Sequence, residues 1–458
     1  MPSAPPQEAA IKRELGLGSA AAAVAGEAIA VGIFLTPAGM AKSLGSPFWL
    51  LAVWIIVGAM TLSGALCYGE LAARYPRSGG SYVYLQECFG GRIAFLYGWM
   101  CLLVLDPGLT AALATGTANY TAYIFHWPAA ATKYIAIFVV LSLALLNAFS
   151  TRVSASFLRR LTWLKIGVLL LLTVWAFVFR VGHWSNFIPF VAQRPGSLPL
   201  LPALAGAMVG AFFSFGGWWD VTKISGEVRD PEKTMPRAML LGVLLVTAVY
   251  ILVSIVFVYL IPLQNVTSDE TFVAQAGEVL FGPLGGKILA AVVVLCVLGS
   301  LGVFMICAPR VYYAMANDGL FLSAVAKTHP RFGTPARAIA IQAAIASLLI
   351  VLGTFEQIIA YFIFVAVFFL GLTVAGLFIS RKHAPKAAVH RRNSRHRVAA
   401  TVFLTLVLLL LVLIVARRPR QAALGAAAVL VGLPLYPFVR RKQGDASAQV
   451  PAPSVSPQ

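Results

Sequence analysis

Two apolar stretches of the sequence contain glycines at positions where a broken helix could offer backbone groups to a ligand. One covers residues 26–34 and is followed by Pro37, and the other covers residues 212–220 and contains Gly216–Gly217. A helix that breaks within a membrane leaves N–H and C=O groups without intrahelical partners. The alternative is that the glycines only permit close helix packing. Because the two stretches occupy corresponding places in two halves of the chain, we favour paired helix breaks that form a binding site.

An amino acid has the two charged groups that such breaks can bind. We expect its carboxylate on N–H groups near Val31 and Gly32, because the N-terminus of a helix carries partial positive charge. Its ammonium group would donate to carbonyl oxygens released by the breaks, near Ala28, Phe213 and Gly216. Phe213 and Phe215 are bulky and apolar enough to cap the pocket, although packing in the core explains them equally well.

Two charged residues fall inside apolar stretches, where ionisable groups are costly and usually functional or paired. Lys165 could reach the cytoplasmic interface with its long side chain, or it could be a fixed cation that steadies the broken first segment. Glu27 could receive a cationic substrate, pair with Lys165 or carry a proton, or it could simply face a water-filled vestibule. Asp106 and Asp220 are weaker candidates, because we expect both near helix ends and within reach of solvent.

The composition indicates the kind of element that positions these residues. Of 458 residues, 60% are hydrophobic and 11% are charged, whereas a soluble domain has about 25% charged residues. We therefore predict an all-α membrane protein surrounded by lipid. A bilayer is crossed by about 20 mainly apolar residues, and the apolar runs predict twelve spanning helices. These are 19–41, 48–72, 92–124, 133–149, 161–180, 199–224, 237–262, 286–316, 337–353, 357–380, 399–416 and 421–439.

The distribution of cations predicts that both termini are cytoplasmic. Of the 35 lysines and arginines, 26 fall on the side of the N-terminus, eight fall on the other side, and Lys165 lies within a helix. Cytoplasmic loops of membrane proteins carry such an excess. Residues 1–18 and 440–458 are then a cytoplasmic segment and a cytoplasmic tail. The turn with Arg417, Arg418 and Arg420 fits poorly, because it places three cations outside.

Several classes of function are not expected from this sequence. The net charge of +19 could suggest nucleic acid, but the cations lie mainly in short loops, so we expect no nucleic-acid partner. The five cysteines show no metal or disulfide spacing. The sequence also has no nucleotide-binding loop and no paired His/Glu motif. We therefore predict no enzyme, no catalytic residues, no metal and no cofactor.

Several stretches, in order, resemble the amino acid–polyamine–organocation superfamily, and most of all its L-type amino-acid transporter branch. They lie within residues 32–37, 64–71, 76–84, 95–99, 216–218, 227–238, 309–319 and 371–378. The resemblance implies a leucine-transporter-like fold, with discontinuous helices 1 and 6. The fold would consist of a five-plus-five inverted repeat over residues 19–180 and 199–380, followed by two helices over residues 399–439.

The resemblance also implies alternating-access transport of amino acids across the cell membrane, usually as sodium-independent exchange. By position, Ala30–Val31–Gly32 match the family's substrate-carboxylate loop. Ala28, Phe213 and Gly216 match its amino-group carbonyls, and Phe213 also matches its aromatic gate. Lys165 matches a lysine that takes the place of a sodium ion in L-type relatives. The bacterial inner membrane is the expected location.

The chain departs from the family at positions that affect the choice of substrate. Ala30–Val31–Gly32 stand where Gly-Ser-Gly is usual, Glu27 replaces a small neutral residue, and Asp106 replaces a frequent basic residue. A proton-coupled or cationic amino-acid or polyamine transporter therefore stays open, and so does a non-transporting amino-acid sensor. We expect no disulfide-linked heavy subunit, because the external loop 125–132 has no cysteine.

Overall fold

Long apolar runs dictate helices in this chain, because a backbone in lipid must satisfy its hydrogen bonds internally. A computed structural model describes residues 15–29, 32–76, 79–149, 155–266, 271–317, 319–321, 334–383 and 394–448. Ala30, Val31 and parts of the predicted cytoplasmic segments, 1–14, 384–393 and 449–458, lie outside these residues. Across the described part the secondary structure is helical, apart from one isolated bridge between Leu15 and Val228.

The described elements follow one another as a series of helices. In chain order they are α1 (Leu17–Ala28), α2 (Gly32–Leu35), α3 (Pro37–Leu44), α4 (Pro47–Arg74), α5 (Ser81–Phe89), α6 (Gly91–Met100), the π-helix η1 (Cys101–Leu105), α7 (Asp106–Phe125), α8 (Ala131–Phe149), α9 (Ala155–Val178), η2 (Trp184–Phe187), α10 (Leu200–Phe215), η3 (Asp220–Glu227), α11 (Pro231–Leu260), η4 (Leu263–Asn265), α12 (Phe272–Cys307), α13 (Pro309–Asn317), α14 (Ala336–Leu352), α15 (Phe355–His383), α17 (Ser394–Arg417) and α18 (Pro419–Ala448).

Nine helical segments of the described chain, some of them made of two consecutive helices, are long and apolar enough to cross a membrane. They overlap nine of the twelve predicted spans. The predicted span 286–316 is wrong in its bounds, because α12 begins at Phe272 and ends at Cys307, and the separate helix α13 begins at Pro309. Two further predicted spans, 161–180 and 337–353, coincide with the shorter apolar helices Trp163–Val178 and Ala336–Leu352. The last predicted span, 421–439, lies within α18, which contains Pro434 and Pro437. The chain is thus an all-helical integral membrane protein.

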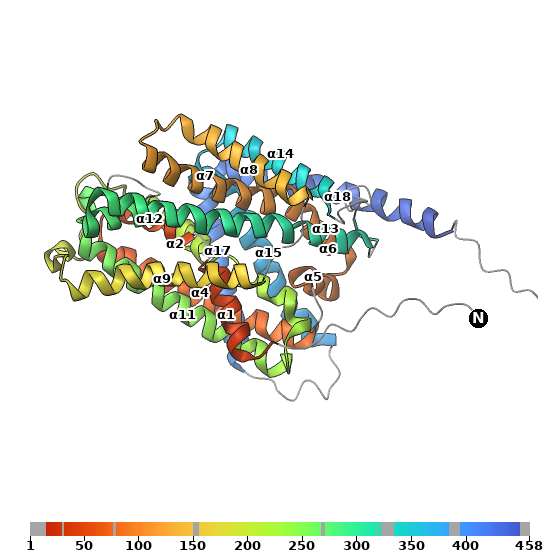
Figure 1. Cartoon of the computed structure of the whole chain (residues 1–458). Coiled ribbons are helices and arrows are strands. Elements are labelled where there is room, and N and C mark those ends of the chain that lie inside the picture. Colours follow the sequence, from red (N-terminus) through yellow and green to blue (C-terminus); the bar gives the residue numbers. More distant parts are fainter. Residues whose placement is uncertain are drawn as a thin grey trace, which may run out of the picture.

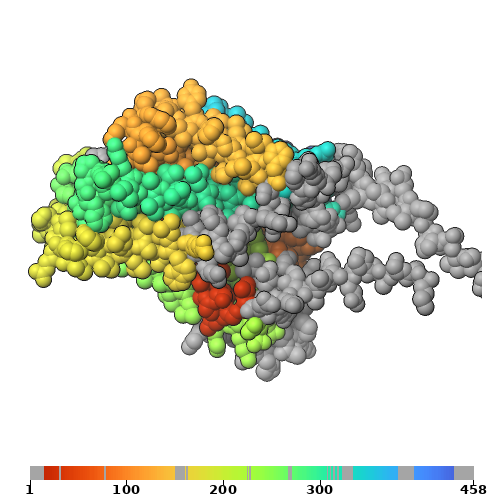
Figure 2. Space-filling view, viewed as in Figure 1, coloured from red at the N-terminus to blue at the C-terminus, as the bar shows by residue number. Residues whose placement is uncertain are grey.

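The long helices pack alongside one another and enclose a continuous apolar core. Figure 1 shows α9 in yellow and α12 in green running along the length of the bundle, with α11 beside α1 and α4. Figure 2 shows α8, α9 and α12 on one face. Large apolar side chains such as Phe138, Leu145 and Trp163 are exposed on α8 and α9. These exposed side chains indicate a surface that contacts lipid rather than water.

Candidate functional site

The first and sixth apolar segments are both interrupted, at the places that the glycines predict. α1 ends at Ala28, and the described chain resumes with α2 at Gly32. α10 ends at Phe215, and Gly217 then takes a φ of 97°, a left-handed conformation that favours glycine. The chain continues from there as η3 rather than as an α-helix. Each interruption frees backbone groups that a continuous helix would have paired.

The two interruptions lie directly against each other. A Cβ atom built on Gly32 would lie 2.2 Å from Cα of Ser214, so glycine alone permits this approach of α2 to α10. The hydroxyls of Thr36 and Ser214 form a hydrogen bond of 2.6 Å beside it. On the other side, a Cβ atom on Gly217 would lie 2.9 Å from the carbonyl oxygen of Glu27. Residues nearly two hundred positions apart therefore form one site.

Tyr250 of α11 joins the two interruptions. Its hydroxyl oxygen lies 2.8 Å from the carbonyl oxygen of Ala28 and 2.6 Å from that of Ser214. Both carbonyls belong to helix ends, where the intrahelical donor is missing. The single hydroxyl proton can serve only one oxygen fully at a time, so each carbonyl keeps capacity for another donor. Tyr250 was not predicted as a site residue, because its only signal in the sequence is a hydroxyl within a long apolar run.

Tyr250→Phe is expected to weaken amino-acid binding about three- to tenfold, because one net hydrogen bond contributes about 0.5–1.5 kcal/mol. The phenyl ring would keep its contacts with Trp54 and Phe215, whose centroids lie 5.1 and 5.0 Å away. The measurement is ligand titration followed by thermal shift. An unchanged affinity would show that the two carbonyls are held in place without this hydroxyl.

The two predicted aromatic caps have different surroundings. The Phe213 ring packs edge-on against Phe355 and Phe362 of α15, with centroids 6.0 and 5.8 Å apart. The Phe215 ring is fully buried and packs with Trp54 and Tyr250 instead. We therefore retain Phe213 as the candidate gate and assign the Phe215 ring to the core.

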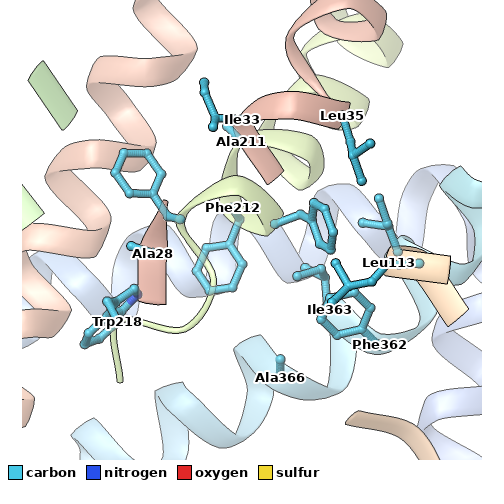
Figure 3. Close-up of a cluster of buried hydrophobic side chains, with 14 of the residues drawn as sticks. Ala28, Ile33, Leu35, Leu113, Ala211, Phe212, Trp218, Phe362, Ile363 and Ala366 are labelled. Carbon is cyan, nitrogen blue, oxygen red and sulfur yellow. The ribbon is translucent and has the colours of Figure 1, made fainter. Parts of the chain in front are cut away.

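Phe212 also approaches the interruptions, although the sequence analysis did not select it. Its ring is fully buried and stacks on Trp219, with centroids 6.1 Å apart. In Figure 3 it lies between Ala28, at the end of α1, and Ala366 of α15. The site is therefore bounded by aromatic rings on the side of α10 and α15.

The predicted ammonium-binding carbonyls are partly occupied by internal donors. The carbonyl oxygen of Phe213 accepts a hydrogen bond from the Gly216 N–H at 3.0 Å, and that of Ala28 faces Tyr250. A carbonyl oxygen has two lone pairs, so each can accept a second donor. Of the predicted carboxylate loop, Gly32 begins α2, where the N–H groups of the first turn have no intrahelical acceptor.

Lys165 does not reach the membrane interface. Its residue is only 4% exposed, and its Nζ donates to Oγ of Ser300 in α12 at 2.7 Å. The Ser300 hydroxyl in turn donates to the carbonyl oxygen of Cys296 at 3.0 Å. A buried cation thus links α9 to α12. Glu27 is close enough to Lys165 for electrostatic attraction, and its side chain lies in a water-accessible recess that protein surrounds.

The expectation that Asp106 lies near a helix end and is accessible to solvent is wrong. It lies within the continuous span Gly91–Phe125 and is only 9% exposed. The π-helical turn Cys101–Leu105 joins α6 to α7, so no helix end exposes this carboxylate. Its oxygen instead accepts a hydrogen bond from the hydroxyl of Tyr312. Asp220 is partly exposed and forms a 2.7 Å ion pair with Lys223.

The groups that surround the interruptions are suited to binding a small polar molecule. No group of three His, Cys, Asp or Glu that could hold a metal ion occurs among the residues that the structure describes. The groups that converge on the interruptions are carbonyl oxygens, N–H groups, hydroxyls and aromatic rings. Such an arrangement can bind a small zwitterion, with charge supplied by helix ends and by Glu27 and Lys165 nearby.

Comparisons with known proteins identify the family of this chain. The chain is similar over 377 residues to the serine/threonine exchanger SteT of Bacillus subtilis, at 30% identity, covering 82% of this chain and 84% of SteT. It is 29% identical over 435 residues to the mouse Asc-type amino acid transporter 1, covering 94% and 82% of the two chains. It is 30% identical over 432 residues to the human large neutral amino acids transporter small subunit 2, covering 93% and 80%. A family model described as amino acid permease matches residues 15–431, and the chain therefore belongs to the amino acid permease family.

Proposed function

We propose that this protein is a secondary transporter that carries neutral amino acids across the cell membrane by sodium-independent exchange or uniport. The observation that supports this most is the contact between two interrupted helices, with Gly32 against Ser214 and Gly217 against Glu27. Relatives named as a serine/threonine exchanger and a transporter of large neutral amino acids point to neutral substrates. In this proposal the protein has twelve spans in a five-plus-five inverted repeat, with both termini in the cytoplasm and no disulfide-linked subunit.

The backbone would bind the two charged ends of the substrate. The carboxylate would accept hydrogen bonds from N–H groups around Ala30, Val31 and Gly32, at the positive end of the helix that continues to Leu44. The ammonium group would donate to the carbonyl oxygens of Ala28, Phe213 and Gly216. The aromatic rings of Phe212 and Phe213 that border the pocket fit the side chain of a neutral amino acid, because a charge buried against them without a partner would be costly.

Alternating access would move the helical segments on either side of this pocket. The start of α1 is joined to the end of η3, because the Arg229 N–H donates to the carbonyl oxygen of Leu15 at 2.9 Å and Leu15 bridges to Val228. The start of α1 and the end of η3 would therefore move together. On the opposite side, Phe213 contacts Phe355 and Phe362 and would close the pocket towards α15. Lys165 would supply a permanent cation where related carriers need sodium.

A second candidate function rests on Glu27. Its side chain lies in a water-accessible recess, and its backbone and Cβ atom lie beside Gly217 at the interruption. Such a carboxylate could receive a cationic amino acid or polyamine, or carry a proton. The buried Asp106 does not favour this candidate, because its carboxylate already accepts a hydrogen bond from Tyr312.

Uptake into proteoliposomes distinguishes the two candidates. Vesicles with purified protein would be loaded with unlabelled L-serine or left empty, and radiolabelled L-serine, L-leucine, L-lysine and putrescine would be added. We expect L-serine or L-leucine uptake that is stimulated by internal L-serine and unchanged when sodium is replaced by potassium. Uptake that requires sodium would contradict the role of Lys165. Uptake of L-lysine or putrescine driven by a pH gradient would support the second candidate instead.

A further inference from the structure

A cavity lies between the outer part of the first segment and the helices α10, α15 and α17, about one helical turn from the interruptions. Its volume is about 340 Å³, within the range of small-molecule pockets. Residues of α2, α3, α10, α15 and α17 line it, together with Thr36, Leu198 and Arg418, and the lining contains no residue of α7 or α12. The walls are mostly apolar, with Met40, Val209, Ile359 and Leu413 among them.

Charged residues stand at the mouth of this cavity, where the spanning helices end. Arg417 is the last residue of α17, and Arg418 begins the turn before α18. Arg418 forms an ion pair with Glu356, which lies in the first turn of α15. Arg417 is exposed, and it forms no ion pair with any residue in the described part of the chain. The cavity thus joins apolar walls to one uncompensated cation at its rim.

The sidedness of the chain makes this cation unusual. Arg417 and Arg418 belong to the basic turn that falls on the predicted outer side, against the usual excess of cations on the inner side. The ion pair with Glu356 accounts for Arg418, whereas Arg417 has no anionic partner among the residues that the structure describes. At the end of a spanning helix, the anionic group within reach is a lipid phosphate.

We propose that the cavity is a binding site for an anionic phospholipid, with one acyl chain between α10 and α17 and the phosphate on Arg417. The apolar walls match the acyl chain, and the rim charge matches the phosphate. Gly206 opens the wall further, because a Cβ atom built on it would have no atom within 4 Å. An amino acid fits less well, since the mostly apolar walls would leave most of its polar surface without hydrogen-bond partners.

The bound lipid would act on the candidate gate. Phe355 lines the cavity and also contacts the Phe213 ring, with centroids 6.0 Å apart. An acyl chain behind Phe355 would hold α15 against Phe213 and would change the rate of opening. This consequence rests on the proposed transport function, whereas lipid binding does not.

Native mass spectrometry of delipidated protein titrated with phosphatidylglycerol tests the site, with phosphatidylcholine of the same chains as the comparison. Arg417→Gln is expected to lower phosphatidylglycerol affinity about fivefold, the equivalent of about 1 kcal/mol per interfacial cation. Gly206→Phe is expected to remove this binding by filling the cavity. Arg420→Gln is the matched control, because Arg420 is exposed in the same turn but does not line the cavity. We expect wild-type affinity for this control.

Three results would overturn the proposal. One is equal affinity of phosphatidylglycerol for wild type, Arg417→Gln and Arg420→Gln. Another is equal binding of phosphatidylcholine and phosphatidylglycerol to the wild type. The third is displacement of the lipid by inorganic phosphate or L-serine at concentrations close to the dissociation constant of the lipid. If Gly206→Phe does not fold, Arg417→Gln still tests the lipid site, because the Arg417 side chain is exposed and its replacement does not disturb the core.

Transport measurements separate this proposal from the proposed function. L-serine uptake is expected to differ between vesicles of phosphatidylcholine alone and vesicles that also contain phosphatidylglycerol, and Arg417→Gln is expected to abolish the difference. Equal uptake in both vesicles would overturn the effect on the gate. No uptake in any vesicle, together with specific lipid binding, would count against the transport function and leave the lipid site supported.

Discussion

Lys165→Met is expected to lower the rate of amino-acid uptake at least about tenfold while the protein still folds. The substitution removes a charge-assisted hydrogen bond, which contributes about 1.5–3 kcal/mol. It also removes the buried cation that lies between α9 and Ser300 of α12 and attracts Glu27. Without this charge, Glu27 near the end of α1 loses its electrostatic attraction to α9. The measurement is initial uptake in proteoliposomes together with thermal stability in detergent.

Two further variants separate the charge from the hydrogen bond. Ser300→Ala keeps the cation and removes only its acceptor, so we expect a smaller loss, about threefold. Lys133→Met is the matched control, because Lys133 is exposed on α8 and donates to the carbonyl oxygen of Val351. We expect wild-type uptake for this control. If Lys165→Met transports at the wild-type rate without sodium, Lys165 does not replace a sodium ion.

Gly32→Ala is expected to abolish detectable amino-acid binding and to destabilise the protein by about 1–3 kcal/mol, the usual cost of overpacking. The added methyl group would lie 2.2 Å from the backbone Cα of Ser214, which cannot rotate away. α2 and α10 would therefore separate, and the hydrogen bond between Thr36 and Ser214 would be lost. Thermal shift with and without L-serine reports both effects.

Gly210→Ala provides the control for this experiment. Gly210 lies one helical turn before Ser214 and faces the same first segment, but its added methyl group would lie 3.5 Å from Met40 and Thr36. That distance is ordinary van der Waals contact, so we expect near-native stability and binding. Equal behaviour of Gly32→Ala and the wild type would mean that the close approach of α2 and α10 is not needed for binding.

Local sequence was sufficient to predict the helices and the places where two of them end. Residues 48–72 were predicted as a span and form α4 over Pro47–Arg74. The agreement is close because the length of the apolar run sets the length of a spanning helix. The end of α10 was predictable because Gly216–Gly217 can leave helical geometry within an apolar run. The shorter helix Ala336–Leu352 was predicted at nearly the same bounds for the same reason.

Contacts between distant segments were not predictable in the same way. Tyr250 lies 222 residues from Ala28, whose carbonyl it approaches, and nothing near Tyr250 in the sequence indicates that partner. The burial of Asp106 depends on a π-helical turn and on Tyr312, 206 residues away. The different surroundings of the Phe213 and Phe215 rings likewise depend on neighbours in α15 and α11. Tertiary packing, rather than local pattern, decides these roles.

The most direct test of the account is an experimental structure of the protein in a lipid nanodisc with bound L-serine. We expect the ligand carboxylate within hydrogen-bond distance of N–H groups around Gly32, and its ammonium group on the carbonyl oxygens of Ala28, Phe213 or Gly216. We also expect the Phe213 ring over the ligand. A ligand bound elsewhere, or first and sixth segments that run as continuous helices past Gly32 and Gly217, would contradict the account.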